Sequence, residues 1–476
     1  NKRDFEDFEA FNIKFDFFYK TSSPENRQFV QDVFKKLEQA GHIYENEIIQ
    51  LYCNTDKKFL PDRYVIGTCP YCKADDQYSD LCEKCGRVPA EIENPHCSIC
   101  GQTPVKEKTK HYFFKLKNFS NKLSQYLESN QNLQKDVKKY VQNWIKEGLI
   151  DWDITRDISW GVPIPVDDEK GKVFYGWFDN HLAYISSAIK FLNDTGKDGK
   201  KFWNESDIYH FIGKDIVYHH YLFLPAMRLG IGEEYKLPDY IPTRGHLTLQ
   251  SKKISKSRNW YIGLKDFLGI FPADYLRFYL ISINSYSQDD LNFDWDEFAT
   301  KINSELIGNF GNLVNRVLGF TVKSFNGIVP DPDEFDNMDK ESEKMIKEFM
   351  LDLGILMEEN HLDRALKKIL QFSAHFNQYF QHKEPWKNGA GTNSCVFLSV
   401  NAVKSLAIAI YPFLPESSQK IWSQLGLDGD ISVHMFDEIS SITLKQGHKL
   451  GSVSPLFEKV EESIIEEQKS KLGAIS

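Results

Sequence analysis

The sequence predicts an α/β protein with a metal-binding insertion and a helical C-terminal bundle. Three observations support this prediction. Short apolar runs alternate with helical patterns over residues 173–250, seven of eight cysteines lie between Cys53 and Cys100, and the pattern beyond Asp296 is almost entirely helical. Alternating β and α units are typical of a parallel sheet. A chain of 476 residues is long enough for about two to four domains.

The composition indicates a folded, soluble chain. Hydrophobic residues make up 41%, charged residues 26% and aromatic residues 14%, and the net charge is −10. These values are typical of globular proteins and argue against disorder. Because the net charge is negative, any RNA contact must come from local patches. No apolar run approaches the roughly 20 residues of a membrane span, and no secretory signal opens the chain, so we expect no membrane partner.

Several segments have helical periodicity. Residues 25–42 carry Phe29, Val33 and Leu37 at helical spacing, and Gly41 ends the run. Helices are also expected over 123–130, 137–148, 181–192 and 218–230, whereas "VFYGWF" (173–178) and "IYHFIG" (208–213) are expected to be strands. Near the end, Val403, Leu406, Ala407 and Ile410 share one helical face, and we assign residues 297–476 to a helical bundle.

The clustered cysteines favour a metal in a reducing compartment over a disulfide framework. The motifs "CPYC" and "CEKC" supply Cys69, Cys72, Cys82 and Cys85. Two such turns, nine residues apart, can surround one tetrahedral Zn2+ with thiolates. Because protein side chains fill all four positions, this zinc site would be structural.

A second set of ligands flanks the first. It consists of Cys53, Asp56, Cys97 and Cys100, and a carboxylate oxygen can ligate zinc. His96 is an alternative fourth ligand, although its adjacency to Cys97 is geometrically awkward. A knuckle without metal is the other alternative. Zinc knuckles also occur in nucleic-acid-binding modules, so these residues alone do not decide the function.

The segment "SKKISKSRNW" at Ser251 to Trp260 is rich in lysine and serine. Such a loop can be an ordinary solvated surface loop. A mobile loop with lysines can also close on the negative charge that develops on a pyrophosphate leaving group.

The neighbouring motifs favour the second interpretation. Lys253-Ile254-Ser255-Lys256-Ser257 resembles the KMSKS motif of class I aminoacyl-tRNA synthetases. Together with "FLPDRYVIGTCPYC", "ITRDISWGVPIP", "YGWFDN", "FIGKDIVYHH" and "GHLTL", in this order, it resembles the methionyl-tRNA synthetases with their zinc-knuckle insertion. The resemblance extends from about Phe11 to about Leu456.

The resemblance implies a partial class I Rossmann-like catalytic domain followed by an anticodon-binding bundle. The implied parts are 1–25, the end of the first half of the catalytic fold; 26–172, a connective insertion with zinc knuckles at about 50–105; 173–250, the second half; 251–296, the KMSKS-like loop and stem-contact region; and 297–476, the helical anticodon-binding domain with a C-terminal tail.

The implied reaction is methionine–tRNA ligation. ATP, with Mg2+, and methionine form an adenylate and pyrophosphate, and the adenylate then acylates initiator and elongator tRNA(Met). Positioning and electrostatics carry the rate of such a reaction. Lys256 would stabilise the pyrophosphate with support from Lys253, and Arg156 would order the amino-acid end unless it forms only a structural ion pair. The implied ATP-binding residues are Lys253, Ser255, Lys256, Ser257, His246 and Leu247.

The resemblance also implies an anticodon site. Asn312 and Arg316 lie at i, i+4 on one helix face, and Trp386 follows later. In the family these positions read the CAU anticodon, and aromatic faces and polar side chains suit unstacked RNA bases. Trp386 alone could instead cap the bundle core.

The first departure from the family is the absence of an HxGH motif, whose histidines contact the ATP phosphates. "RGHL" at Arg244 to Leu247 is not that motif, and the chain opens on Asn1 rather than Met. We therefore expect that the gene product begins earlier and that this chain alone is inactive. A non-catalytic tRNA-binding protein derived from a synthetase is an alternative, although the preserved lysines of the KMSKS-like loop argue against it.

The second departure lies in the amino-acid pocket implied by the resemblance. The family reads Trp-x-Asp-Ala-Pro-x-Gly-Tyr, and Asn180 and His181 replace Ala-Pro here. Downstream, His219 replaces Phe and Leu224 replaces Trp. Trp177, Tyr184 and His220 complete the pocket. Three interpretations stay open: methionine with the new polar groups turned away or hydrated, a more polar or bulkier amino acid, or a paralogue with weak or lost activity.

Overall fold

The structure is a computed structural model that describes residues 2–79, 82, 84, 89, 91–166, 171–232, 234–256 and 258–473. The chain divides into two compact units. One consists of Asp16–Pro242, and the other combines Asn1–Phe15 with Thr243–Ser476.

The unit Asp16–Pro242 contains most of the described strands. They are β1 (Ile43–Cys53), β2 (Lys58–Phe59), β3 (Val65–Thr68), β4 (Gln77–Tyr78), β5 (Glu93–Cys97), β6 (Val105–Phe114), β7 (Trp152–Asp153), β8 (Thr155–Arg156), β9 (Val173–Phe174) and β10 (Ile212–Gly213). Its helices are α2 (Pro24–Gln39), α3 (Ser120–Ser129), α4 (Lys135–Glu147), α5 (Gly176–Asp194), α6 (Gly199–Glu205) and α7 (Leu224–Gly230), with a π-helical segment η4 (His219–Phe223) before α7.

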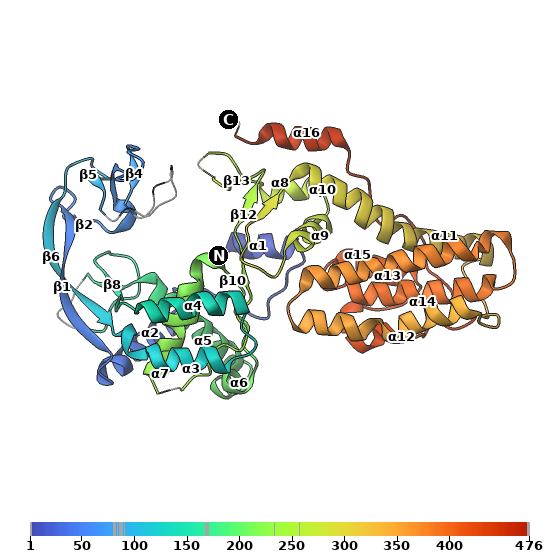
Figure 1. Cartoon of the computed structure of the whole chain (residues 1–476), viewed down its shortest axis with the longest axis horizontal. Coiled ribbons are helices and arrows are strands. Elements are labelled where there is room, and N and C mark those ends of the chain that lie inside the picture. The colour runs from blue at the N-terminus through green and yellow to red at the C-terminus, as the bar shows by residue number, and fades with distance from the viewer. Residues whose placement is uncertain are drawn as a thin grey trace. The chain divides into compact units, whose positions relative to one another are not determined.

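A long antiparallel ladder joins β1 and β6, which lie side by side in Figure 1. The register runs from Ile43 opposite Phe114 to Tyr52 opposite Val105, and the sheet order is β2-β1-β6-β7. A smaller sheet, β4-β3-β5, carries part of the cysteine-rich insertion. The main core of the unit packs around fully buried aromatic residues such as Phe34, Phe114 and Phe178.

The helix predicted over 25–42 is confirmed as α2. Ser23 caps its N-terminus, since the Ser23 hydroxyl accepts a hydrogen bond from the Asn26 N–H at 3.1 Å, and Pro24 occupies the first turn. Val33 and Leu37 are buried, as the helical spacing predicts. The helix ends at Gln39, just before Gly41, whose φ of +74° suits a residue without a side chain.

The strand prediction over "VFYGWF" holds only for Val173 and Phe174, because helix α5 already begins at Gly176. Likewise, only Ile212 and Gly213 of "IYHFIG" form a strand. Short apolar runs do not distinguish a buried strand from the first turn of a buried helix. The strands β8 and β9 pair antiparallel, whereas Tyr209 and Tyr240 form a parallel bridge within the segment 173–250, as predicted for that segment. A parallel pairing occurs between β12 and β14 of the other unit.

The second unit has short strands and a helical bundle. Its strands are β11 (Thr243–Arg244), β12 (Leu247–Leu249), β13 (Lys252–Lys253) and β14 (Leu291–Phe293). Its helices are α1 (Lys2–Ala10), α8 (Leu264–Leu268), α9 (Ala273–Ile283), α10 (Trp295–Lys301), the π-helical η5 (Ile302–Gly311), α11 (Asn312–Phe325), α12 (Asn337–Glu358), α13 (Leu362–Lys383), α14 (Thr392–Ile410), α15 (Pro415–Gln424) and α16 (Glu462–Lys471). The helical character predicted beyond Asp296 is therefore confirmed, and α11 to α14 lie alongside one another in Figure 1.

Helix α14 is the centre of this bundle. Val403, Leu406, Ala407 and Ile410 are buried, as predicted, but so are the residues on its other faces, including Lys404. The Lys404 ammonium donates to the backbone carbonyls of Glu438 and Ser441, which explains how a charge is tolerated there. Among the described residues, α14 has the length and composition of a membrane span, contrary to our expectation, but 94% of the relevant window is buried in the unit.

The turn after α15 provides a test of this packing. Gly426 has a φ of +71°, and a Cβ there would lie 2.2 Å from the Lys449 carbonyl oxygen. Gly429 has a φ of +87° but nothing within 4 Å of its virtual Cβ. We expect Gly429→Ala to lower the free energy of unfolding by about 1 kcal/mol, through backbone strain alone. Gly426→Ala should cost about 3 kcal/mol or more, because strain and overpacking combine. Urea denaturation of both variants measures the difference, and equal costs would contradict the packing described here.

Candidate functional site

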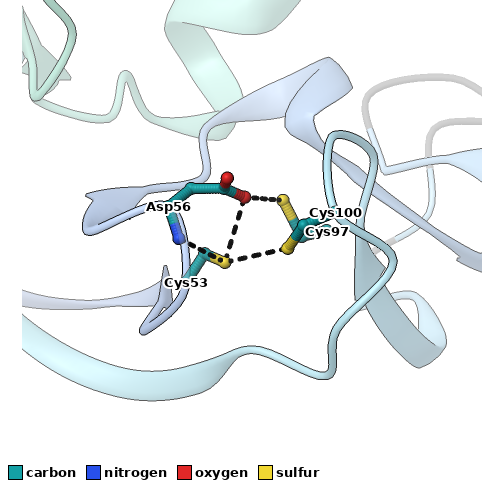
Figure 2. A group of neighbouring side chains, drawn as sticks. All are labelled: Cys53, Asp56, Cys97 and Cys100. Carbon is teal, nitrogen blue, oxygen red and sulfur yellow. Dashed lines mark hydrogen bonds between the residues drawn. The ribbon is translucent and has the colours of Figure 1, made fainter.

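Four ligand side chains meet near the end of the β1–β6 ladder (Figure 2). The ligand atoms of Cys53, Asp56, Cys97 and Cys100 all lie within 4.8 Å of one another. The Cys97 thiol lies 3.1 Å from an Asp56 carboxylate oxygen, and the Cys53 and Cys100 sulfurs lie 3.4 Å apart. The set predicted from the sequence is therefore brought together, and its donor atoms fit a tetrahedral zinc ion. His96 is outside this group and lies 4.0 Å from Asp76.

Local backbone geometry builds this cluster. Cys53 ends β1, and Asp56 lies in the tight connection to β2, in which Lys57 has a φ of +52°. Cys97 ends β5, and its carbonyl accepts a hydrogen bond from the Gly101 N–H at 2.8 Å. The Gly101 φ of +73° closes the Cys-x-x-Cys-Gly turn.

The described part of the other predicted zinc site is also clustered. Cys69, Cys72 and Cys82 have ligand atoms within 4.8 Å of one another, and Cys72 and Cys82 lie 3.6 Å apart. The fourth predicted ligand, Cys85, lies outside the described residues. All seven described cysteines are free thiols, so the described part of the chain contains no disulfide.

The lysine-rich loop begins as a tight hairpin. Leu249 pairs with Lys252, and the two residues between them, Gln250 and Ser251, both have positive φ, as a type I′ turn requires. The Ser255 and Trp260 backbones exchange hydrogen bonds at 2.8 and 2.9 Å, which closes a second loop around Lys256.

The lysines of this loop differ in their surroundings. The Lys252 ammonium lies 4.3 Å from the centroid of the Trp260 ring, a cation–π contact. Lys253 and Lys256 are exposed. Ser257 lies outside the described residues.

The predicted adenine-side backbone lies on β12. Leu247 pairs in parallel with Leu291, and the His246 N–H donates to an Asp290 carboxylate oxygen at 2.8 Å. The preceding Gly245 allows this close approach, since a Cβ there would lie 1.9 Å from the Asp289 carbonyl oxygen. The glycine of "RGHL" therefore has a packing role.

In the unit Asp16–Pro242, the predicted amino-acid pocket forms an aromatic and histidine cluster. The Trp177 and His219 rings stack at 4.4 Å between centroids, and His181 lies 5.4 Å from His219 and 4.8 Å from His220. His181 is 1% exposed. Neither of its ring nitrogens has a hydrogen-bond partner within the described parts of the chain. Burial and three neighbouring imidazoles hold the His181 pKa well below its usual value, so the ring is neutral.

Tyr184 and His220 are hydrogen-bonded, whereas His219 Nδ1 is buried without a partner among the described residues. The Tyr184 hydroxyl lies 3.2 Å from His220 Nε2, and His220 Nδ1 lies 3.0 Å from the Ile216 carbonyl oxygen. His220 is thus the tautomer that donates from Nδ1. Sequence reasoning missed His210, whose ring packs 4.6 Å from Tyr184. Leu224 is fully buried in the core.

Arg156 and Asn180 line a cavity of about 720 Å3 in the same unit, together with Trp160 and Asp179. The Arg156 guanidinium forms an ion pair with Asp153 at 3.2 Å and lies 3.9 Å from the centroid of the Tyr175 ring. The structural ion pair considered from the sequence therefore exists, and Arg156 also lines the cavity.

In the helical unit, Asn312 and Arg316 line one groove of about 420 Å3 between α11 and α13. Asn312 donates to the Asn377 side chain at 3.0 Å, and Arg316 donates to the Gln381 side chain at 2.6 Å. The Arg316 guanidinium lies 5.1 Å from the Trp386 ring centroid. Trp386 is 42% exposed, which argues against its role as a core cap.

Sequence reasoning missed Asn377 and Gln381. The signal was available, because these two residues are spaced i, i+4 on α13 just as Asn312 and Arg316 are on α11. The two pairs are joined by side-chain hydrogen bonds between adjacent helices, Asn312 with Asn377 and Arg316 with Gln381.

Comparison with known proteins defines the class of this protein. The family model "tRNA synthetases class I (M)" matches residues 1–318, and the model "Anticodon binding domain of methionyl tRNA ligase" matches residues 329–476. The methionine–tRNA ligase of Methanopyrus kandleri is 41% identical over 478 residues, which cover 98% of this chain and 70% of the relative. That of Pyrococcus horikoshii is 40% identical over 481 residues, covering 96% and 65%. The chain belongs to the methionyl-tRNA synthetase family.

Solved structures agree on the fold. The structure of Mycobacterium tuberculosis methionyl-tRNA synthetase in complex with methionyl-adenylate superposes with a TM-score of 0.78 at 23% identity. The match covers 96% of this chain and 85% of that one. The apo form of the same enzyme gives a TM-score of 0.76 at 22% identity.

Asp179, which lines the cavity, gives a prediction about the pH dependence of stability. It is 8% exposed, and burial raises its pKa to about 6, although backbone N–H groups of the first turn of α5 act in the opposite direction. The folded protein therefore holds this proton more tightly than the unfolded chain, and stability falls as the pH rises from about 4 through about 6. We expect Asp179→Asn to be more stable than the parent by about 2–3 kcal/mol at pH 7.5 and equal to it at pH 4.

The measurement is urea denaturation at both pH values. Asp194→Asn is the control, because Asp194 is exposed at the opposite end of α5, where it forms an ion pair with Lys190. It should show no gain at pH 7.5. A gain for Asp179→Asn that does not change with pH would contradict the proposed ionisation.

Proposed function

We propose that this protein catalyses methionine–tRNA ligation, in which methionine is activated with ATP and transferred to tRNA. The observation that carries this proposal is the 41% identity to a methionine–tRNA ligase across 98% of the chain. The preserved Lys253, Lys256, Asn312, Arg316 and Trp386 support it residue by residue.

In this proposal, Lys256 stabilises the pyrophosphate that leaves ATP, and Lys253 assists. Both lysines are exposed on a loop whose base is fixed by the Ser255–Trp260 backbone pair. Compact, mobile ammonium groups can neutralise charge that appears only in the transition state. Ser255, Ser257 and the backbone of His246 and Leu247 complete the ATP site, with Mg2+ accompanying the nucleotide.

The amino acid would lie against Trp177, Tyr184, His219 and His220, with Arg156 and Asn180 on the adjoining cavity wall. An apolar aromatic stack suits the flexible side chain of methionine. His181 departs from this simple picture, because an unpaired buried imidazole costs about 1–3 kcal/mol. A hydrogen-bonding group on the ligand or an ordered water that occupies the pocket would offset this cost.

The groove between α11 and α13 would read the anticodon. Arg316 and Asn312 offer donors to base edges, and the half-exposed Trp386 offers a stacking face. We extend the proposal to both initiator and elongator tRNA, which share the CAU anticodon. The segment 251–296 would contact the stem of the tRNA, and residues 26–172 would form the insertion that carries the zinc sites. A role in translation and free cysteines favour the cytoplasm.

The test is ATP–pyrophosphate exchange by the product of the complete gene, run across a panel of amino acids, followed by charging of tRNA with a CAU anticodon. We expect methionine to give the fastest exchange. Lys256→Ala should lower kcat by about 100-fold or more, as the loss of a transition-state contact does, with little change in methionine binding. Lys252→Ala is the matched control and should retain exchange, since Lys252 packs on Trp260. Fastest exchange with another amino acid, or none with methionine, would refute the proposal.

We further propose one structural zinc ion at each cysteine cluster. Metal analysis of the purified chain should find both. Cys97→Ala and Cys69→Ala should each lose one, because three ligands hold zinc poorly in a structural site. Cys395→Ala is the control, since this buried cysteine lies in α14, outside both clusters. Full zinc content in Cys97→Ala would contradict the second site.

A further inference from the structure

A buried network of charges lies behind Arg156, where β6, β7, β8 and β9 meet. At its centre is His111 on β6, which is 0% exposed. His111 Nδ1 lies 2.8 and 3.0 Å from the two Asp153 carboxylate oxygens, and Nε2 lies 3.0 Å from an Asp157 oxygen. An ionised carboxylate only accepts hydrogen bonds, so both ring nitrogens must donate. His111 is therefore an imidazolium.

The charges around the ring support this state. Burial alone would lower the His111 pKa, but the hydrogen bonds to Asp153 and Asp157 outweigh it and raise the pKa. Lys172 acts in the opposite direction as a like charge. Asp153, Asp157, Lys172 and Arg156 are the charged residues around the His111 ring, and Thr109 is a neutral member of the network.

The two carboxylates have different roles. The Asp157 carboxylate accepts three hydrogen bonds, from Lys172 at 2.5 Å, Thr109 at 2.7 Å and His111 at 3.0 Å. Asp153 is shared, because it accepts from His111 on one side and forms the 3.2 Å ion pair with Arg156 on the other. Asp153 thus connects His111 to Arg156.

Arg156 is held on two further sides. Its Nη1 donates to the Thr155 carbonyl oxygen at 2.7 Å, and its guanidinium stacks on Tyr175 at 3.9 Å. The same residue lines the cavity of about 720 Å3. A guanidinium that is fixed in this way can meet a ligand with little loss of side-chain entropy.

We propose that His111 is a positioning residue for Arg156: as an imidazolium it fixes Asp153, and Asp153 holds the Arg156 guanidinium at the cavity wall. This proposal rests on the proposed function, which supplies the role of Arg156 at the amino-acid end of the site. If His111 only stabilised the fold, its loss would lower stability without acting through Arg156.

The first test addresses the protonation state and is independent of activity. The 476-residue chain is labelled with 15N-histidine, and the imidazole nitrogens are observed by NMR between pH 6 and 7, with His111→Gln for assignment. We expect His111 to keep both ring protons over this range. The buried His181 and His220 should be neutral, because burial lowers their pKa values. A single-proton tautomer of His111 at pH 7 would overturn the proposal.

The second test asks whether His111 acts through Arg156. Methionine-dependent exchange by the product of the complete gene is measured for His111→Gln, for Arg156→Ala and for the double variant. We expect each single change to lower kcat by about tenfold or more, and the double variant to be no worse than Arg156→Ala alone, as in a coupled double-mutant cycle. Multiplied losses in the double variant would overturn the proposal and indicate a purely structural role.

Two further variants keep the result interpretable. Asp153→Asn replaces His111→Gln if the latter does not fold, because it weakens the same link while preserving shape. Thr109→Val removes a hydrogen bond to Asp157 but leaves the Asp153–Arg156 pair intact, so its effect should multiply with that of Arg156→Ala. If Arg156→Ala keeps full exchange activity, Arg156 has no role in the reaction and the positioning proposal fails. The proposed function is tested separately, by the methionine-dependent exchange of the unmodified enzyme.

Discussion

The long pairing of β1 with β6 is the constraint on which two features of the unit Asp16–Pro242 depend: the ligand cluster around Cys53 and the charged network around His111. At one end of the ladder, β1 places Cys53 beside Asp56, Cys97 and Cys100. Nearer the other end, the ladder places His111 opposite Asn46, and β7 then pairs with β6 so that Asp153 is opposite Phe113. A shift of one residue in this register would turn every side chain to the opposite face of the sheet. It would remove Cys53 from its partners and His111 from its carboxylates together.

The histidines of this unit show how surroundings decide protonation. His111, His181 and His220 are all buried, and burial favours the neutral ring in each. Only His111 has a carboxylate at each nitrogen, and these two hydrogen bonds reverse the effect of burial. Burial is the main cause that lowers the pKa values of His181 and His220, and the positive charge of Arg228 acts on both in the same direction. One type of side chain therefore serves as a fixed cation behind Arg156 and as a neutral wall beside Trp177.

Much of this arrangement could be predicted from the sequence, where the pattern was local. The spacing of Cys97 and Cys100, and the i, i+4 spacing of Asn312 and Arg316, depend on one turn or one helix. Features that depend on distant pairing could not be predicted. His111 meets Asp153 across 42 residues and Asp157 across 46, and no periodicity reports such contacts. The predicted end of the "VFYGWF" strand was wrong for another reason, because a short apolar run fits a buried strand and the first turn of a buried helix equally well.

The two side-chain hydrogen bonds between α11 and α13 have a consequence for the base selectivity of the proposed anticodon site. The Asn312 amide and the Arg316 Nη2 group already donate to the side chains of Asn377 and Gln381. If this groove binds a nucleotide, as we propose, the nucleotide must compete with the side chains of Asn377 and Gln381 for these two donor groups. A base whose edge replaces the broken bonds exchanges one set of partners for another at little net cost, whereas a base of the wrong pattern leaves polar groups without partners. In the proposed anticodon site, the two hydrogen bonds between α11 and α13 would therefore penalise any base that cannot replace both of them.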